Sequence, residues 1–319
     1  MRRIPLIAAL TVAALALGAL AWFALQYTQA DPEVFDLDDT ARQSAPGSFI
    51  RTSAGTVHYE LAGPADGRIV VLIHGFSVPA YLWDPTFQAL TAAGFRVLRY
   101  DLFGRGFSDR PDARYDGAFF DRQLLELLGA LHIAAPVDLV GASMGGPIAA
   151  GFVCRHPNRA RSLVLFDPGY SHGQTLPWNF RLPIIGDYNF AVKMMPRMAR
   201  SQLADFLHPE RFPDWPKRYE PQMRYHGFRR ALLATLRHYL AEDWSREFAC
   251  VGQGTAPVLL VWGKHDQDVP FATSREVLAA IPRATFLPVE DAAHVPFLEH
   301  PEITDPALVA FLTSSDRNR

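Results

Sequence analysis

"VDLVGASMGGPIAAGF" (137–152) is the stretch that decides the fold, because it sets a serine among glycines between an apolar run and a run of small residues. Glycine costs about 0.5–1 kcal/mol relative to alanine inside regular structure, so this clustering needs another cause. Residues 141–145 (GASMG) fit the pattern G-x-S-x-G, between an expected strand at 137–140 and an expected helix at 144–155. That context predicts a sharp strand-to-helix turn that lifts the Ser143 hydroxyl clear of the sheet, at the positive end of the helix. The plainer interpretation is a Gly/Ser turn that only connects two elements.

Outward from this stretch, short apolar runs alternate with segments of helical spacing. Two strands are expected within 49–63, around a turn at Ala54–Gly55. Further strands are expected at 68–73, 95–100, 137–140, 162–166, 257–262 and 284–289, and helices at about 81–93, 118–132, 144–155, 271–281 and 302–313. This alternation predicts an α/β fold with a mostly parallel central sheet and helices on both faces.

One long stretch, 169–250, breaks the alternation. It is rich in aromatic residues, Met and Pro, and it has no clear strand. We therefore expect a mostly helical cap inserted late in the sheet. The expected core then has two parts, 49–168 and 251–319, on either side of the cap.

The N-terminus carries a long apolar segment. Arg2 and Arg3 precede an uncharged stretch from about Ile4 to Leu25, which is long enough for a transmembrane helix. We expect 1–30 to be a membrane anchor, with a cleaved signal peptide (and so a secreted protein) or a buried helix as alternatives. Basic residues stay in the cytoplasm, so the rest of the chain is expected in the periplasm or outside the cell. Residues 31–48, acidic and then Ser/Pro/Gly-rich, suit a linker.

Composition and short motifs exclude several classes of function. The net charge of −2 provides no basic surface for nucleic acid. No G-x-x-x-x-G-K-[ST], H-E-x-x-H or G-x-G-x-x-G occurs, so no metal and no organic cofactor is expected. Cys154 and Cys250 lie far apart in apolar settings without C-x-x-C spacing, and we expect both to be free core thiols.

A serine hydroxyl is a weak nucleophile that needs a base and a group to orient that base. When the serine lies on such a turn, the partners follow in the order Ser, acid, His. The loop after the strand at 257–262 contains Asp266 and Asp268. Asp266 lies closer to the strand end and is the expected acid, whereas Asp268 suits the cap of the next helix. Asp167, after the strand at 162–166, is the other position where the acid can lie.

The base is expected in "PVEDAAHVPFLEHPE" (288–302), after the last strand. His294 lies in the loop itself, whereas His300 leads into the final helix. The chain order favours His294, although a single histidine is more often a surface or capping residue.

The developing oxyanion needs hydrogen-bond donors in the transition state. The N–H of Met144, directly after the serine, is one expected donor. The second is expected from "VLIHGFSVPAYLW" (71–83), where the His74–Gly75 bend directs the N–H of Phe76 at the substrate carbonyl. His74 itself is expected to support this loop.

Six stretches in chain order resemble the α/β-hydrolase fold superfamily, in its serine esterase and lipase-like branch. They are "HGF", "YDLFGRGFSDRP" (100–111), "GASMGG", "LVLFDP", "VWGKHDQDVP" and "HVPFLEHPE", and the resemblance covers about 49–315. It implies Ser143 as nucleophile, Asp266 as acid, His294 as base, and Phe76 and Met144 as oxyanion donors. Asp101 and Gly104 are interpreted as structural.

Hydrolases that cleave carbon–carbon bonds in ring-fission products also resemble this chain, since they share the Ser-Met-Gly-Gly turn. They typically carry Asn before the nucleophile and Trp after the base, where this chain has Ala142 and Val295. A serine at 143 also disfavours the dehalogenases and epoxide hydrolases, whose nucleophile is an aspartate.

In such a fold the cap forms a lid over the serine. Its inner face is expected to hold Trp178, Phe180, Phe190, Met194, Met195 and Phe206, some of them only as the lid's own core. The expected substrate-binding residues are Trp178, Phe180 and Val295. A pocket lined in this way suits a small-molecule ester with an apolar acyl group, such as a short- to medium-chain ester or a monoacylglycerol. The alternatives are a carbon–carbon hydrolase on the same three residues and a non-catalytic binding protein on a hydrolase scaffold.

Overall fold

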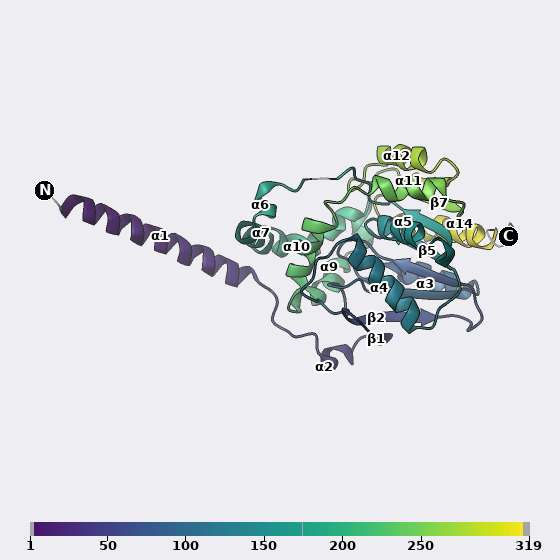
Figure 1. Cartoon of the computed structure of the whole chain (residues 1–319), viewed down its shortest axis with the longest axis horizontal. Helices are drawn as coiled ribbons and strands as arrows, with labels where there is room; N and C mark the ends of the chain where they lie inside the picture. Colours follow the sequence, from purple (N-terminus) through teal and green to yellow (C-terminus); the bar gives the residue numbers. More distant parts are fainter. Residues whose placement is uncertain (1–2, 174, 315–319) are drawn as a thin grey trace.

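The computed structural model describes residues 3–173 and 175–314, and its centre is an eight-stranded sheet with the order β1-β2-β4-β3-β5-β6-β7-β8 (Figure 1). β1 pairs with β2, and β2 with β4, in antiparallel fashion, and all other neighbours are parallel. The strands are β1 (Ser48–Thr52), β2 (Gly55–Ala62), β3 (Ile69–Ile73), β4 (Arg96–Tyr100), β5 (Val137–Ala142), β6 (Ala160–Phe166), β7 (Val258–Gly263) and β8 (Thr285–Val289).

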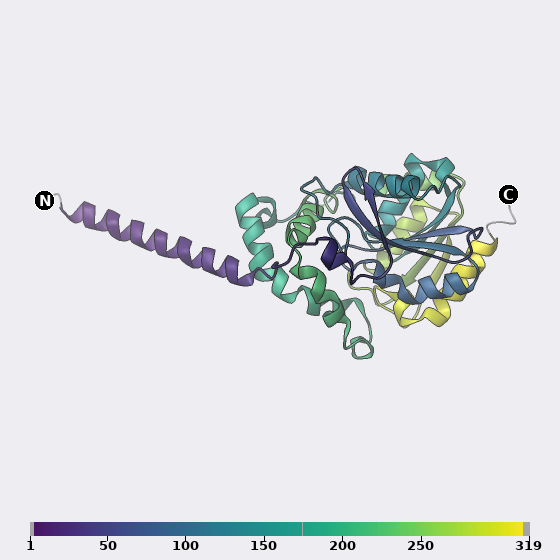
Figure 2. The ribbon, with the colours of Figure 1, turned by 90° about the horizontal axis from the view of Figure 1, so that it is seen from below.

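Helices cover both faces of this sheet, as Figure 2 shows from below. One face packs against α3 (Asp84–Ala92) and α14 (Pro301–Ser314). The opposite face packs against α4 (Gly117–Ala130), α5 (Gly145–Arg155), α11 (Ser245–Gln253) and α12 (Ser274–Ala280). Neighbouring residues of a strand point to opposite faces, so the two apolar layers share each central strand.

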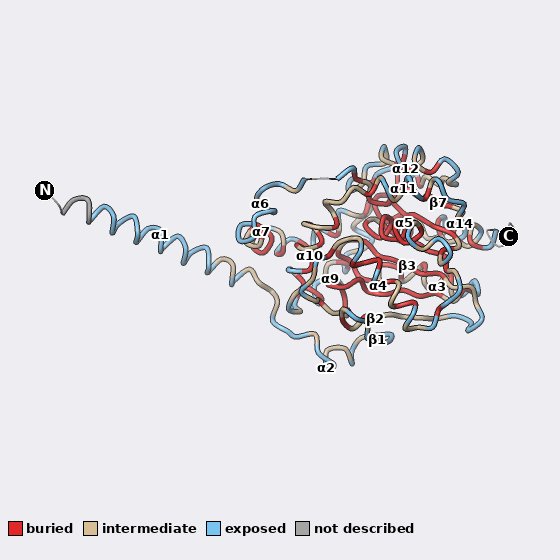
Figure 3. Tube along the Cα trace, viewed as in Figure 1, coloured by how far each residue is buried: buried red, intermediate tan, exposed pale blue. Residues whose placement is uncertain are grey.

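β3 illustrates why the buried strands read as continuous apolar runs. Val70 and Leu72 belong to the layer beside α3, whereas Val71 and Ile73 belong to the layer beside α5. All four side chains have no exposed surface. A strand buried on both faces needs apolar residues at every position. The buried residues in Figure 3 are concentrated in these central strands and the helices against them.

The cap lies between β6 and β7, as the sequence predicts. Its helices are short and include α6 (Trp178–Arg181), α7 (Pro183–Asn189), η3 (Phe190–Met194), α8 (Met195–Ser201), η4 (Gln202–Asp205), α9 (Trp215–Tyr219) and α10 (Phe228–His238). The last helix of the stretch 169–250, α11, packs on α5 and α12 instead, and so belongs to the core layer. The cap proper therefore ends before α11.

A disulfide joins Cys154, at the end of α5, to Cys250 in α11, with the two Cα atoms 6.0 Å apart. The expectation of two free thiols is therefore wrong. The two cysteines are 96 residues apart in sequence, and they meet only because the chain returns from the cap to the core at α11. Sequence spacing carries no sign of that return.

The N-terminal helix α1 (Arg3–Ala30) extends away from the rest of the protein (Figures 1 and 2). Its segment Ile7–Ala30 has a mean hydropathy of 2.2 in its most apolar window and is long enough to cross a membrane. Its last turns touch the cap. The ring of Phe23 lies edge-on to that of Tyr188, and the Arg229 guanidinium lies over the ring of Tyr27.

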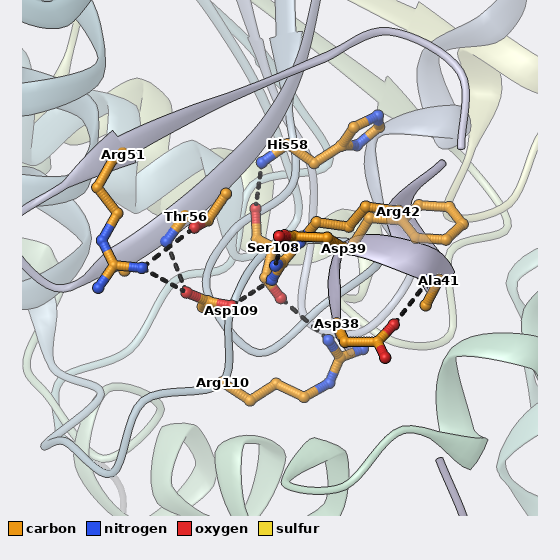
Figure 4. Close-up of polar contacts among 12 residues, drawn as sticks. Asp38, Asp39, Ala41, Arg42, Arg51, Thr56, His58, Ser108, Asp109 and Arg110 are labelled. Atoms are coloured by element: carbon orange, nitrogen blue, oxygen red, sulfur yellow. Dashed lines mark hydrogen bonds and ion pairs between the residues drawn. The ribbon is translucent and has the colours of Figure 1, made fainter. Parts of the chain in front are cut away.

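The linker 31–48 is docked on the domain along much of its length. The Glu33 carboxylate accepts hydrogen bonds from the backbone N–H groups of Gly227 and Arg229 in the cap. Further along, Arg42 of the short helix α2 (Asp39–Arg42) pairs with Asp109, whose carboxylate also accepts the N–H of Thr56 in β2 (Figure 4). These contacts fix the linker, so α1 is not joined to the core by a free tether.

Candidate functional site

Ser143 lies on the sharp turn between β5 and α5 that the sequence predicts. Its φ angle is +52°, in the left-handed region that non-glycine residues rarely adopt. Its N–H donates to the carbonyl of Phe166 at 3.0 Å, and its own carbonyl accepts the N–H groups of Gly146 and Gly169 at 2.9 Å. Three backbone hydrogen bonds therefore hold the strained residue in place.

The glycines around Ser143 leave room for backbone alone. A Cβ on Gly141 would lie 2.3 Å from the carbonyl oxygen of Gly145, and a Cβ on Gly145 would lie 2.3 Å from that of Ile73. A Cβ on Gly75 would lie 3.1 Å from the Cβ of Ser143. The close passage of strand, helix and neighbouring loop explains why this stretch clusters glycine.

The expected base and acid are paired. The His294 Nδ1 lies 2.8 Å from Asp266 Oδ2, so the ring N–H donates to the carboxylate and leaves Nε2 free to act as a base. The Asp266 Oδ1 accepts the backbone N–H groups of Asp268 and Val269 at 2.8 and 2.9 Å. His300 instead pairs with the Glu302 carboxylate at 2.8 Å. The structure thus brings together Asp266 and His294, and it places His300 in a separate surface contact.

Two cavities meet at Ser143 and His294. Both are lined by Phe76, Ser143, Asp268 and His294. The first, of about 330 Å³, lies under the cap and is also lined by Val78, Leu82, Met194, Met198, Asp205 and Val295. The second, of about 540 Å³, is also lined by Met144, Tyr170, Leu176, Pro177, Leu240 and Trp244.

The cap residues at these cavities differ from those expected. Val295 lines the first cavity, but Trp178 is 62 % exposed, and neither Trp178 nor Phe180 lines either cavity within the described residues. The structure therefore does not bring Trp178 and Phe180 to the site. Met194 and Met198 line the first cavity instead, and α6 contains no buried residue.

Two backbone donors are available beside Ser143. The N–H groups of Phe76 and Met144 have no acceptor among the residues that the structure describes, and both residues line the second cavity. Two N–H groups without an acceptor that border a cavity beside a strained serine suit a ligand oxygen. The positions are those expected of oxyanion donors.

Side chains behind the Phe76 loop hold its carbonyls. The Arg105 Nε donates to the Phe76 carbonyl at 2.7 Å, and the cap residue Gln222 donates to the carbonyl of Ser77 at 3.0 Å. His74 accepts the N–H of Leu102 at Nε2 and is fully buried, and burial lowers its pKa to about 4. The role of His74 as a support is consistent with this contact. Sequence reasoning missed Arg105 and Gln222, and only the position of Arg105 inside "DLFGRGFSD" hinted at a role.

Carboxyl groups surround the imidazole of His294. Burial, then the charge of Asp266, raises the pKa of Asp167 well above its usual range. Burial raises the pKa of Asp205 to about 8, the His294 charge opposing and Asp268 adding to the effect. For His294 itself, burial lowers the pKa, but the hydrogen bond to Asp266 and the charge of Asp266 outweigh this and raise it overall. The charge of the site therefore depends on the protonation of several neighbouring carboxyl groups.

The described part of the chain contains no group of three or more His, Cys, Asp or Glu side chains placed to hold a metal ion. Neither cavity at Ser143 is lined by a Lys or Arg among the described residues. The arrangement joins a strained serine, a carboxylate-paired histidine and two unpaired N–H groups. Such an arrangement can form and stabilise a covalent intermediate with a carbonyl compound.

Comparisons with known proteins agree with this architecture. A family model described as alpha/beta hydrolase fold matches residues 68–301. The chain is 27% identical to Lipase 1 of Psychrobacter immobilis over 254 residues, 79% of each chain. It is also 27% identical to the 2-hydroxymuconate semialdehyde hydrolase of Pseudomonas sp. (strain CF600) over 271 residues, 82% of this chain and 92% of that one.

Among solved structures, that of a membrane phospholipase A, described as a bacterial virulence factor, has a TM-score of 0.68 at 24% identity. The match covers 100% of both chains, so it extends over the N-terminal helix as well as the domain. This likeness shows a shared fold. The relatives are named for different reactions, so they indicate hydrolysis in general and leave the bond to be inferred from the site.

Proposed function

Because the chain belongs to the α/β-hydrolase fold family, we propose that it is a serine hydrolase that cleaves carboxylic esters through an acyl-enzyme. The observation that carries the proposal is that His294, paired with Asp266 at 2.8 Å, lines the same two cavities as Ser143. The unpaired N–H groups of Phe76 and Met144 support it, since an ester carbonyl develops negative charge on oxygen when it is attacked.

In the first half of the reaction, the Ser143 oxygen bonds to the ester carbonyl carbon while His294 Nε2 takes the hydroxyl proton. The carbonyl electron pair moves to oxygen, and the resulting oxyanion accepts hydrogen bonds from Phe76 and Met144. One such donor is worth about 3 kcal/mol of barrier. The C=O bond then re-forms, the bond to the alkoxy oxygen breaks, and the imidazolium gives its proton to the leaving alcohol.

In the second half, a water molecule replaces the alcohol. His294 takes a proton from the water as its oxygen attacks the acyl-enzyme carbonyl. Collapse of the second oxyanion breaks the bond to Ser143, which recovers its proton from the imidazolium. Throughout, Asp266 remains ionised and keeps the imidazole oriented, with its Oδ1 held by the two loop N–H groups.

The two cavities suit the two halves of an ester. We assign the acyl chain to the cavity of about 330 Å³ under the cap, because Val78, Leu82, Met194, Met198 and Val295 give it an apolar wall. The alcohol part then occupies the cavity of about 540 Å³, whose wall mixes aromatic side chains with Ser171 and Thr175. Methionines give an adaptable wall, which suits acyl groups of more than one length.

The charge of the cavities favours esters over ring-fission products. Those products carry carboxylate groups, which require a cationic or amide-rich subsite. The described lining of both cavities has no Lys or Arg, and both include Asp268. A carbon–carbon hydrolase therefore remains only as an alternative outcome of the test below.

We further propose that α1 anchors the enzyme and that the domain lies outside the cytoplasm. The two N-terminal arginines precede the apolar helix, and the Cys154–Cys250 disulfide suits an oxidising compartment. Close to the end of α1, the cap exposes an apolar surface formed by Trp178, Leu182, Ile184 and Ile185. This surface suits contact with lipid.

The test compares Ser143→Ala with Ser314→Ala, an exposed serine at the end of α14 that lines neither cavity. The full-length protein in detergent is assayed on p-nitrophenyl esters of increasing acyl length and on a ring-fission dienoate. We expect ester turnover by the wild type and by Ser314→Ala, and its loss in a folded Ser143→Ala. Turnover of the dienoate alone would favour the carbon–carbon hydrolase, and turnover of neither would favour a binding protein.

A further inference from the structure

Asp167 is a buried carboxyl that the proposed reaction does not use. It directly follows β6 and has no exposed surface. Its φ angle is +43°, and its N–H donates to the carbonyl of Val261 in β7 at 3.0 Å. A non-glycine residue in the left-handed region costs about 1–3 kcal/mol, and such strain clusters at functional sites. The fold therefore holds this side chain at the catalytic end of the sheet against a local preference.

The two oxygens of Asp167 have different surroundings. Oδ1 accepts the backbone N–H of Gly263 at 2.8 Å. Oδ2 is buried and has no N–H or hydroxyl donor among the described residues. Asp266 is the charged group with the largest effect on Asp167, and it acts partly through a contact between the two carboxyl side chains. Two carboxyl groups share a hydrogen bond only when one of them carries a proton, because an ionised carboxylate has no donor.

We propose that Asp167 is a positioning residue for Asp266, staying protonated in the resting protein and donating its carboxyl hydrogen to the Asp266 carboxylate. Its effect on the rate rests on the proposed function, whereas its protonation does not. No bond other than the hydrogen bond is made or broken, and the proton stays on Asp167 throughout the reaction.

The partners of the two carboxyls decide which one carries the proton. Asp266 accepts three hydrogen bonds, from His294 Nδ1 and from the N–H groups of Asp268 and Val269, and each favours its charged form. Asp167 accepts one, from Gly263. Two buried carboxylates in contact do not both ionise, so the proton belongs to the less supported one. The pKa of Asp167, which is raised above its usual range, also indicates that Asp167 carries the proton.

The neutral state of Asp167 has a consequence for the base. The charged or titratable groups that face His294 are Asp266, Asp205 and Asp167, and Asp268 faces Asp205. Each ionised carboxylate favours the imidazolium, which cannot take a proton from Ser143. Asp167 therefore supports Asp266 through a hydrogen bond without adding a negative charge beside the base.

The first test uses Asp167→Asn and Asp167→Gly, which both tolerate a positive φ. An Asn side chain keeps both contacts, since its oxygen accepts from Gly263 and its amide donates to Asp266. We expect Asp167→Gly to lower kcat about tenfold with KM nearly unchanged, because a hydrogen bond to a charged group is lost. We expect Asn to restore kcat to within about threefold of the wild type. We also expect the acid limb of its kcat/KM profile to lie at the same pH as in the wild type.

The pH profile identifies the alternative. If Asp167 were ionised, Asn would remove a negative charge beside His294, and the acid limb would move to lower pH by about one unit or more. That shift would overturn the proposal. Equal kcat and equal acid limbs for the Asn and Gly variants would also overturn it, because a hydrogen-bonding side chain at position 167 would then make no difference.

The second test needs no activity. The infrared difference spectrum of wild type minus Asp167→Asn, taken on the full-length protein near pH 7, is expected to contain the C=O stretch of a neutral carboxylic acid. A carboxylate band in its place would overturn the proposal even if the Asp167→Gly variant failed to fold. Loss of ester turnover in the wild type would instead count against the proposed function, with the spectrum still deciding the state of Asp167.

Discussion

The turn that carries Ser143 and the loops that carry Asp266 and His294 meet at one edge of the sheet, but they are built differently. Around Ser143 the chain is packed backbone against backbone, so closely that a single Cβ at Gly145 would overlap the carbonyl of Ile73. Around His294 the structure depends on hydrogen bonds and on the charges of carboxyl groups. Packing restricts which residues can occupy the first region, whereas protonation determines the state of the second.

This difference predicts two kinds of response. Substitutions in the Ser143 turn should act through packing and be nearly independent of pH. Substitutions among the carboxyl groups should leave the packing intact and change how stability or activity depends on pH.

The largest effect is expected from His294→Ala. Without the base, kcat for a p-nitrophenyl ester should fall by about 10⁴-fold or more, since a serine hydroxyl is a weak nucleophile by itself. The matched control is His300→Ala, the neighbouring histidine that pairs with Glu302 on the surface. Steady-state kinetics check both, and a His294→Ala variant within tenfold of the wild type would contradict the assigned base.

The next effect concerns the helix that follows Ser143. The Cys154–Cys250 disulfide ties α5 to α11 across 96 residues, and closing a loop of that length stabilises a protein by about 4.7 kcal/mol in the chain-entropy view. The double variant Cys154→Ser/Cys250→Ser should lose most of this free energy of unfolding. Denaturant unfolding measures the loss, and wild type unfolded under reducing conditions should match the variant. No difference between oxidised and reduced wild type would show that the bond is not formed.

Gly145→Ala tests the shape limit directly. Its Cβ would lie 2.3 Å from a backbone oxygen that cannot swing away, so we expect a loss of about 3 kcal/mol in the free energy of unfolding, together with lost activity at every pH. Gly129→Ala in α4 is the control, because its Cβ would meet nothing within 4 Å. There, alanine should stabilise the helix by about 0.5–1 kcal/mol. Equal effects of the two substitutions would contradict the packing argument.

The last variant, Asp205→Asn, differs from the others because its effect depends on pH. The pKa of Asp205 rises from 3.8 to about 8 on folding, so the folded protein binds this proton more tightly than the unfolded chain does. Protonation of Asp205 therefore stabilises the folded wild type at low pH, and this stabilisation is lost as the pH rises from about 4 to about 8. Asn at position 205 does not titrate, so the variant shows no such loss. The melting temperature of the variant relative to the wild type should therefore rise over this range and stay constant above it.

Asp66→Asn is the control for that series, because Asp66 is exposed and lies outside both cavities. Its melting temperature relative to the wild type should be the same at every pH. A constant difference for Asp205→Asn as well would mean that the carboxyl at 205 is not perturbed by folding.

The parallel core could be predicted from the sequence to within two residues in most strands. The run at 68–73 corresponds to β3 (Ile69–Ile73), and the run at 162–166 to β6 (Ala160–Phe166). A strand buried on both faces can be recognised in the sequence as a continuous apolar run, because every position must be apolar. The G-x-S-x-G stretch could be placed for the same reason, since it follows one such strand.

Features that depend on how distant segments meet could not be predicted. Trp178 reads as an inner residue of the cap but lies outside, because cap helices are short and are fixed by tertiary contacts. The Cys154–Cys250 bond depends on the return of the chain to α5. Asp167 could be identified only as an alternative acid, and its contact with Asp266 follows from the pairing of β6 with β7.

The most direct measurement is covalent labelling of the full-length protein with a fluorophosphonate, followed by mapping of the modified peptide. Such a probe reacts with a serine whose hydroxyl is activated by a nearby base and whose oxyanion is stabilised. We predict a single adduct, on Ser143, that forms at least about a hundredfold more slowly in His294→Ala. An adduct on another serine, or labelling that His294→Ala leaves unchanged, would contradict the account.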